Sequence, residues 1–379
     1  PELQGLPGFA QNFLPWGRAP HVGELFKFPA AAKGLRAIAQ SKGAAFYGGE
    51  IAQAIEKFAA ANGGSITAKD LADFKPEWVK PIAQDYRGYT LHEIPPNGQG
   101  IAALIALGIL SNFDLASHAV DGVDSQHLQI EAMKLAFADV YRYVADPRYM
   151  EVTPEQMLDP AYLASRAKLI DMKKAQNFQA GNPVKGGTIY LTAADENGMM
   201  VSFIQSNYMG FGSGCVEPNF GISLQNRGHG FSLNAQGLNP ANLVAPGKRP
   251  FHTIIPAFLT RNDGGKVFPQ MSFGVMGGDM QPQGHLQTLV RMMTYQQQPQ
   301  AACDAPRWKV NRDFTLDVES NMNPATVAGL IAMGHTLKKI DDPYMDFGAG
   351  QFIWRLSDDI EDGYIAASDP RRDGQAAVY

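Results

Sequence analysis

The sequence predicts an α+β fold in which stacked antiparallel sheets are covered by helices, and three features support this prediction. Apolar residues recur at helical spacing through most of the first half of the chain. β-Forming runs joined by turn signals begin at Thr188. Helical and strand-like runs follow after residue 280, and hairpins with helices kept outside them are typical of layered folds.

Helices dominate the first half of the chain. In residues 29–42, Leu35, Ile38 and Ala39 share one face, and Gly43 ends the pattern. The other predicted elements there are helices over residues 49–61, 98–110 and 124–145, short helices that begin at the cap-like residues Thr67 and Thr153, and a strand over residues 89–94.

Strand-like runs dominate the second half. Residues 188–194 and 199–207 are rich in β-formers, and an Asn-Gly turn between them predicts a hairpin. The preceding residues 171–187 are polar and weakly patterned, which predicts an exposed linker. The remaining predictions are strands over residues 221–225, 253–261, 266–275, 314–319, 352–356 and 364–367, and helices over residues 282–295 and 324–333.

Composition argues against several kinds of partner. The 379 residues are 45% hydrophobic, which is enough for a large core in one or two domains. A net charge of -5 argues against nucleic acid and anionic membranes, and no apolar run reaches the ~18 residues of a membrane helix. Cys215 and Cys303 are too few for a disulfide framework or a CxxC metal site, although one bridge between them stays open.

Motifs for metals and cofactors are weak. Residues 210–214 are glycine-rich but lack the Lys-Ser/Thr ending of a phosphate loop, and no Gly-x-Ser-x-Gly elbow occurs. His229, His252 and His285 each stand alone, without the spacing of a metal-binding pair. We therefore expect no metal and no cofactor.

The sequence Gly186-Gly187-Thr188 stands directly before the predicted hairpin and has two interpretations. It is either an ordinary turn or a cleavage site whose threonine becomes a catalytic N-terminus. A threonine at a free N-terminus can use its own α-amine as the base, and glycines lower the steric barrier to a strained backbone. On this pattern alone the ordinary turn is favoured, because glycine is common in turns.

Gly277 and Gly278 lie between a predicted strand and a predicted helix. Backbone N–H groups at the start of a helix are able to hold a developing oxyanion. A plain strand-to-helix turn is the simpler interpretation when these two glycines are considered by themselves.

Taken together, the motifs of the chain resemble those of the γ-glutamyltransferases, which are N-terminal-nucleophile hydrolases. The first half carries GGSITAKDLADF, YRGYTLHEIPPNGQG and EAMKLAFADVYRYVADP, which are similar to the large subunit of that family. The second half carries TIYLTAADENGMMVSFIQSNYMGFGSG, PGKRPFHTIIPAF and FGVMGGDMQPQGH, which are similar to its small subunit. Many motifs in one order are more specific than any single motif, so the resemblance favours the cleavage interpretation of Thr188.

The resemblance implies a four-layer αββα sandwich and a chain that cuts itself between Gly187 and Thr188. Residues 1–187 are then the C-terminal, mostly helical part of a large subunit, and residues 188–379 are the small subunit. The two stay associated as a heterodimer. In this scheme Thr188 is the nucleophile, and Ser206 matches the hydroxyl that the family places beside it.

The resemblance also assigns the oxyanion hole and the substrate pocket. Gly277 and Gly278 match the oxyanion-hole glycines. Gly230 stands where the family has an acid for the α-amine of a γ-glutamyl group, and Arg227 stands where it has Gln or Glu. These departures resemble the acylase-type branch, whose enzymes act on glutaryl-like side chains. The substrate-binding positions implied by the resemblance are Tyr208, Asn226, Arg227, His252 and Thr253.

Three functions follow, from two classes of protein. The leading expectation is a self-processing amidohydrolase or acyltransferase that cleaves a glutaryl-like or γ-glutamyl amide, a small molecule, through an acyl-enzyme. The alternatives are a true glutathione hydrolase and a non-catalytic scaffold that retains the fold. The family's large subunit begins earlier, with an Arg that grips the substrate's α-carboxylate, so we expect an N-terminal segment to be missing. The compartment stays open between cytoplasm and periplasm.

Overall fold

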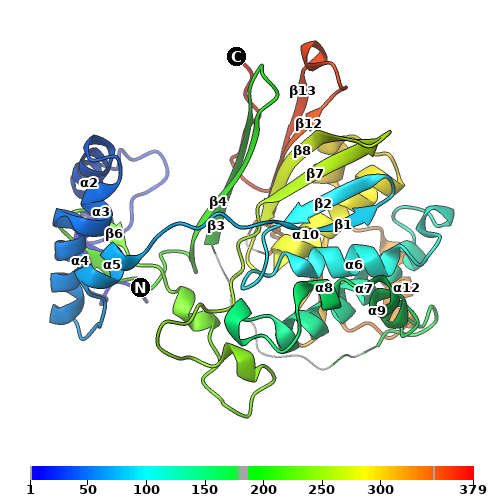
Figure 1. The fold of residues 1–379 in the computed structure, drawn as a ribbon, viewed down its shortest axis with the longest axis horizontal. Helices are drawn as coiled ribbons and strands as arrows, with labels where there is room; N and C mark the ends of the chain where they lie inside the picture. Colours follow the sequence, from blue (N-terminus) through cyan, green and yellow to red (C-terminus); the bar gives the residue numbers. More distant parts are fainter. Residues whose placement is uncertain (1, 177, 179–186, 345) are drawn as a thin grey trace. The chain divides into compact units, whose positions relative to one another are not determined.

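The computed structural model of the chain describes residues 2–176, 178, 187–344 and 346–379, which divide into two compact units (Figure 1). The first unit comprises Pro1–Trp78 and Asn207–Arg227, and the second comprises Val79–Ser206 and Gly228–Tyr379. These two units are defined by packing, whereas the predicted boundary between Gly187 and Thr188 is a site of chain cleavage. It stays a prediction.

The first unit is a small helical body. Ile51 and Ile55 lie on one face of α4 and pack with Phe220 in its core. Thr67 caps α5 through a reciprocal bond with Asp70, as its capping-box pattern predicts. The elements of this unit are α1 (Phe9–Phe13), α2 (Pro29–Gln40), α3 (Ala44–Gly48), α4 (Glu50–Ala61), α5 (Ala68–Asp73), β5 (Val216–Glu217) and β6 (Ile222–Ser223).

The second unit is built on a six-stranded antiparallel sheet with the strand order β1-β2-β7-β8-β12-β13. This arrangement agrees with the antiparallel sheet that the sequence predicts. Its strands are β1 (Ile82–Tyr86), β2 (Tyr89–Glu93), β7 (Ala257–Asp263), β8 (Lys266–Met276), β12 (Ala349–Arg355) and β13 (Tyr364–Ser368).

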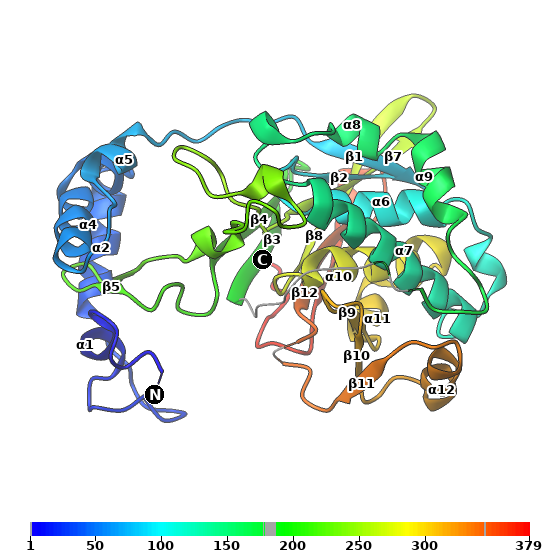
Figure 2. The same cartoon turned by 90° about the horizontal axis from the view of Figure 1, so that it is seen from below.

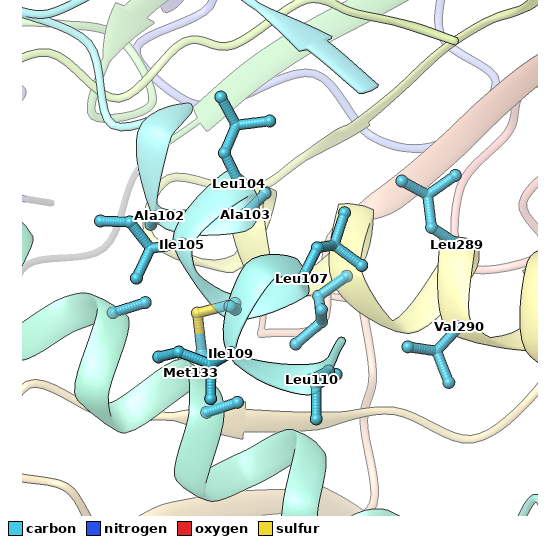
Figure 3. Packing of buried hydrophobic residues seen from close by; sticks show 14 of the residues in the cluster. Ala102, Ala103, Leu104, Ile105, Leu107, Ile109, Leu110, Met133, Leu289 and Val290 are labelled. Carbon is cyan, nitrogen blue, oxygen red and sulfur yellow. The ribbon is translucent and has the colours of Figure 1, made fainter. Parts of the chain in front are cut away.

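Helices cover one face of this sheet (Figure 2). All ten residues of α6 are buried, as expected for a helix that is apolar on every side. Figure 3 shows α6 packed against Met133 of α7 and against Leu289 and Val290 at the end of α10. The helices of this unit are α6 (Ile101–Leu110), α7 (Val123–Tyr143), α8 (Pro154–Met157), α9 (Pro160–Ala167), α10 (Met280–Leu289) with a π-helical turn (Val290–Thr294), α11 (Pro299–Asp304) and α12 (Pro324–Ala332).

Shorter elements complete the second unit and the chain between the units. They are the small sheet of β9 (Trp308–Val310), β10 (Leu316–Glu319) and β11 (Leu337–Ile340), and the 3-10 turns Leu115–Ser117, Pro147–Tyr149, Arg227–Gly230, Pro240–Asn242 and Ile360–Asp362. No described helix has the length and apolar character needed to cross a bilayer. Cys215 and Cys303 are both free thiols, so the bridge that the sequence left open does not form.

The other face of the sheet carries the hairpin of β3 (Gly187–Ala194) and β4 (Met200–Tyr208). Tyr190 on β3 packs against Gly274 of β8, where an added Cβ would lie 2.5 Å from the tyrosine ring. The next residue, Val275, faces the opposite side and touches Gly284 of α10, again at 2.5 Å from an added Cβ. Since successive strand residues point to opposite faces, β8 is enclosed between a hairpin and a helix.

The layers are therefore helices, sheet and hairpin, and the predicted α+β class is confirmed. The outward face of the hairpin is apolar and exposed in the described structure, through Ile189, Leu191, Val201 and Phe203.

Several predicted boundaries shift for reasons visible in the structure. Strand β7 begins at Ala257 instead of residue 253, because His252 pairs with Gly98 and Asn97 across the chain. For the same reason α6 begins at Ile101. No residue of Asp171–Gln176 is buried, in agreement with the predicted exposed linker, but this part of the chain is anchored, since the Ala175 N–H donates to the Met333 carbonyl at 2.7 Å. Most of its remainder lies outside the described residues.

We predict that Gly274→Ala destabilises the protein by about 1–3 kcal/mol, because the new methyl group collides with the Tyr190 ring. Chemical denaturation measures this change in the free energy of unfolding. In a Tyr190→Val background the same substitution should cost almost nothing. Gly228→Ala is the control, since no heavy atom lies within 4 Å of its added Cβ. An equal loss in both backgrounds contradicts the prediction.

Candidate active site

Thr188 is the second residue of β3 and is buried, with 5% of its surface exposed. Its hydroxyl donates to the Ser206 hydroxyl on β4 at 3.1 Å. The structure therefore brings together the predicted nucleophile and the hydroxyl predicted to lie beside it. The neighbouring Ile189 points outward and is 64% exposed, which follows from the alternation of side chains along a strand.

The packing of β3 on β8 places Thr188 near the glycine turn. The Thr192 hydroxyl donates to the Ser272 hydroxyl at 2.7 Å, and Tyr190 lies against Gly274. Each step of two residues along β3 thus matches a step of two residues in the opposite direction along β8. One further step brings Thr188 level with Met276, the residue before Gly277.

Gly277 and Gly278 form a tight turn between β8 and α10. Their φ angles are 128° and 60°, in the left-handed region that favours glycine. A Cβ on Gly277 would lie 2.9 Å from the Gly348 Cα, so the close approach also requires glycine there. The Gly277 carbonyl accepts from the Met280 N–H at 3.1 Å. Because N–H and C=O point in opposite directions across a trans peptide, the Gly278 N–H points away from the first turn of α10.

A buried carboxyl–imidazole pair supports this turn from the helix side. His285 accepts from the Val275 N–H through Nε2 at 3.1 Å, and its Nδ1 lies 2.6 Å from Glu93 Oε1. Since Nε2 faces a donor, the ring is neutral, and Nδ1–H donates to Glu93. Burial lowers the pKa of His285 to about 3. The two groups are close enough for an ion pair, but the imidazole carries no charge.

Glu93 is held as a neutral acid. It is 1% exposed, and burial raises its pKa well above the ordinary value for a glutamate. Its Oε2 has no hydrogen-bond partner among the described residues. A carboxylate in this position would leave a buried charge with a single neutral donor.

The predicted substrate residues are divided between the two units. His252 and Thr253 belong to the second unit, as does Thr188, and Thr253 is buried. Tyr208 and Arg227 belong to the first unit, where the Arg227 guanidinium lies 4.6 Å from the Tyr208 ring centroid. Burial lowers the pKa of Arg227 to about 10, so the group is still a cation at neutral pH.

The backbone around Tyr208 is fixed by Asn226. Tyr208 has φ 77°, which is strained for an aromatic residue and easier for Asn or Gly. The Asn226 N–H donates to the Asn207 carbonyl, and the Asn226 side-chain oxygen accepts from the Met209 N–H, both at 3.1 Å. Asn226 therefore shapes the end of β4 in addition to any contact with substrate.

Gly230 has no room for the acid that it replaces. An added Cβ would collide with the Phe251 carbonyl oxygen, and the Gly230 carbonyl accepts from Asn242 Nδ2 at 2.6 Å. An acidic side chain at this position would require the backbone to move. The backbone of this chain therefore excludes an acid at position 230.

One cluster among the described residues has the composition of a metal site, with two residues on α7 and the third between α12 and β11. His127, Glu131 and His335 converge, but Lys134 Nζ donates to Glu131 at 2.9 Å and to His335 Nδ1 at 3.2 Å. The ammonium occupies the place of a cation. Burial lowers the pKa of Lys134 and brings that of His335 to about 3, so His335 accepts this bond as a neutral ring.

This cluster holds the chain that leads toward residue 187. Lys134 also donates to the Gln176 carbonyl at 3.1 Å, and Glu131 accepts from the Gln176 N–H at 3.0 Å. His335 donates onward to His127, whose Nε2–H donates to the Asp171 carbonyl at 2.9 Å. The cluster is thus an anchor for the backbone of Asp171–Gln176.

Comparison with known proteins identifies the class of this site. The family described as Gamma-glutamyltranspeptidase matches residues 1–379. The glutathione hydrolase-like YwrD proenzyme of Bacillus subtilis is 35% identical over 99% of this chain and 70% of its own length. The oxamate amidohydrolase proenzyme of Klebsiella pneumoniae is 36% identical over 100% of this chain and 70% of its own length.

A solved structure gives the same result. The crystal structure of a cephalosporin acylase from Bacillus halodurans superposes with a TM-score of 0.90 and 47% identity, covering 98% of this chain and 66% of that one. The chain belongs to the γ-glutamyltranspeptidase family, and it is an enzyme of the γ-glutamyltransferase-like, N-terminal-nucleophile type. The family resemblance of its motifs is confirmed.

We predict that the free energy of unfolding of Glu93→Gln, taken relative to that of the wild type, increases as the pH rises. The pKa of Glu93 is higher in the folded protein than in the unfolded protein. Glu93 therefore makes its full contribution to stability only below its unfolded pKa of ~4.3, and this contribution is lost as the pH rises toward the folded pKa. Gln keeps the shape and the acceptor for His285 but does not titrate. The stability difference should grow by up to ~1.4 kcal/mol per pH unit within that window.

Urea denaturation at pH 5, 6, 7 and 8 measures this difference. Both proteins should carry Thr188→Ala, so that the predicted cut does not enter the comparison. If Glu93→Gln loses stability at the higher pH values, Glu93 is ionised in the folded protein and its assignment as a neutral acid is wrong.

Proposed function

We propose that the chain is a self-processing N-terminal-threonine amidohydrolase or acyltransferase that works through an acyl-enzyme. The observation that carries this proposal is the position of Thr188. Its hydroxyl is buried and hydrogen-bonded to Ser206, and the register of β3 on β8, extended by one step, leads to the residue before the glycine turn. A hydroxyl nucleophile beside outward-pointing backbone N–H groups is the arrangement that acyl transfer requires. The proenzyme names of two relatives support self-processing.

The proposed reaction has two balanced steps. The Thr188 Oγ attacks the amide carbonyl, and the free α-amine of Thr188, with an ordinary pKa near 7.7–8.0, takes the hydroxyl proton. The tetrahedral oxyanion is held by the N–H groups of Gly277 and Gly278. The amine leaves with the proton, and an ester to Thr188 remains. Water, or an acceptor amine, then attacks the ester and releases the acyl group.

The proposed cut uses the same hydroxyl. In the uncut chain Thr188 has no free amine, so its Oγ attacks the Gly187 carbonyl and the peptide becomes an ester. Formation of the ester breaks the peptide C–N bond, and the nitrogen takes the hydroxyl proton and becomes the free α-amine of Thr188. Water then hydrolyses the ester, which releases the Gly187 carboxylate and restores the Thr188 hydroxyl. The hydrogen bond to Ser206 orients the Oγ in both reactions. The products are residues 1–187 and 188–379, which we propose remain together as a heterodimer.

We predict that freshly purified protein runs as two bands on a denaturing gel. N-terminal sequencing of the fragment that starts at residue 188 should read Thr-Ile-Tyr. Thr188→Ala removes the nucleophile and should leave one band and no activity, whereas Thr188→Ser should cut slowly. Thr192 lies further along β3 on the same side of the strand and gives the matched control. The Thr192→Ala variant should cut normally. An active wild-type protein with a single intact chain would refute the proposal.

For the substrate, we propose an acyl group that ends in a carboxylate, such as glutaryl. Arg227 is a buried cation beside Tyr208, and a guanidinium binds a carboxylate through two parallel hydrogen bonds. Gly230 leaves no room for an acid that would pair a γ-glutamyl ammonium. The likeness to a cephalosporin acylase supports this choice.

A glutathione hydrolase is the second candidate, and a specific observation favours it. One relative that spans nearly the whole chain carries a glutathione hydrolase-like name. A γ-glutamyl group has the length of a glutaryl group, with an ammonium added on its α-carbon. The two candidates therefore differ in the charge that the pocket must neutralise.

We predict that the full-length enzyme has at least a roughly tenfold higher kcat/KM for glutaryl-p-nitroanilide than for γ-glutamyl-p-nitroanilide, since one decade corresponds to ~1.4 kcal/mol. Arg227→Gln should shrink this ratio by weakening the glutaryl reaction. Arg261→Gln, which removes a surface arginine paired with Asp358, is the control and should keep the ratio. A preference of the wild type for the γ-glutamyl compound makes the glutathione hydrolase the better assignment.

A further inference from the structure

Gln99 connects two segments of the site through one side-chain nitrogen. Gln99 lies in the segment that connects β2 to α6, and its side chain is fully buried. Its Nε2 donates to the Gly278 carbonyl at 2.8 Å and to the Thr253 carbonyl at 2.9 Å. Its backbone N–H donates to the His252 carbonyl at 3.0 Å.

The chemistry of the partners fixes the orientation of this amide. Both partners are carbonyl oxygens, so the nitrogen must face them, and the oxygen must face away. Gln99 Oε1 is buried and has no partner among the described residues. An unsatisfied buried acceptor destabilises a protein, and a methionine would fill the same volume without one. The two bonds from Nε2 are therefore the contribution that an amide makes at this position.

The bond from Gln99 adds a second hydrogen bond to the Gly278 carbonyl. Glycine at φ 60° has no side chain to restrict it, so its orientation depends on the bonds of the flanking peptides. The Gly277 carbonyl is held by Met280, and the Gly278 carbonyl is held by Gln281 at 3.2 Å and by Gln99. The Gly278 N–H shares its peptide with the Gly277 carbonyl, and Gln99 and Gln281 hold the next peptide, so the peptides on both sides of Gly278 are fixed.

Hydrogen bonds of Asn97 also join the segments that precede α6 and β7, and these bonds do not involve Gln99. Asn97 Nδ2 donates to the Pro250 carbonyl at 2.6 Å, and the Asn97 carbonyl accepts from the His252 N–H at 2.9 Å. These bonds join the two segments that precede α6 and β7. Loss of the Gln99 amide thus leaves the pairing of these segments intact and removes one of the two bonds to the Gly278 carbonyl.

We propose that Gln99 is a positioning residue that directs the Gly278 N–H toward the tetrahedral intermediate, and that ties this N–H to the substrate segment at Thr253. The inference rests on the proposed function. It adds a residue that touches neither substrate nor nucleophile and acts through the peptide of Gly278. Misplacement of a catalytic group by about 1 Å is enough to lower a rate by ~10²-fold.

The test compares Gln99→Met with Gln287→Met in the full-length protein. Gln287 is a matched control, because it is a buried glutamine of α10 whose Nε2 also donates to two carbonyls, those of Gln283 and Trp308. We expect Gln99→Met to lower kcat by ~10²-fold with KM within about threefold of the wild type. Gln287→Met should keep kcat within about twofold, at a similar or larger loss of melting temperature.

A boronic acid that carries the acyl chain of the preferred substrate separates positioning from general damage. Its boron becomes tetrahedral on binding the nucleophile and so mimics the intermediate. Its Ki should rise for Gln99→Met by the same factor by which kcat/KM falls. Gln99→Asn keeps a donor with shorter reach and should lose less activity, which gives a second variant if the methionine variant does not fold.

Each outcome has a defined meaning. An unchanged kcat in a folded Gln99→Met or Gln99→Asn variant overturns the inference, as does an equal loss in Gln287→Met. A rise in KM with an unchanged boronate Ki also overturns it, because the residue would then act on ground-state binding. Retained activity in Thr188→Ala overturns the proposed function itself and is distinguishable from all of these results.

Discussion

The close packing of β8 between the hairpin and α10 is the constraint on which the site depends. Gly274 admits the Tyr190 ring on one face, and Gly284 admits Val275 on the other. Side chains at either glycine would push a layer outward. The hairpin would then carry Thr188 away from the end of β8, where the glycine turn begins. The same packing sets His285 against the Val275 N–H, so the layers and the support of the turn share one origin.

The polar groups beneath the turn are neutral. Glu93 is held as an acid, His285 as an uncharged ring, and Gln99 as an amide. A full charge at this depth would act strongly on a nearby reacting group, because the protein interior screens charge weakly. Dipoles with fixed directions stabilise a developing oxyanion without a competing charge. The burial that makes these groups costly to the fold therefore also suits them to the reaction that we propose.

The sequence predicts local features well and distant contacts poorly. The capping boxes, the β3–β4 hairpin and the pairing of Thr188 with Ser206 depend on residues close in sequence or on ordered motifs. Strand β1 was missed because its alternation is short and polar, and α9 was missed although Asp159 caps it. Glu93 and His285 are 192 residues apart, and Gln99 and Gly278 are 179 apart, so no local pattern could connect them. Likewise, only the backbone shows that Gly230 lacks room for an acid.

The anchor at Asp171–Gln176 has a consequence for the enzyme after the proposed cut. Lys134 and Glu131 hold the backbone of Gln176, and His335 passes the chain of hydrogen bonds through His127 to Asp171. His127, Glu131 and Lys134 would belong to one product of the proposed cut, residues 1–187, and His335 to the other, residues 188–379. The same buried cluster would then become a polar joint between two chains, made from side chains that are costly to expose separately.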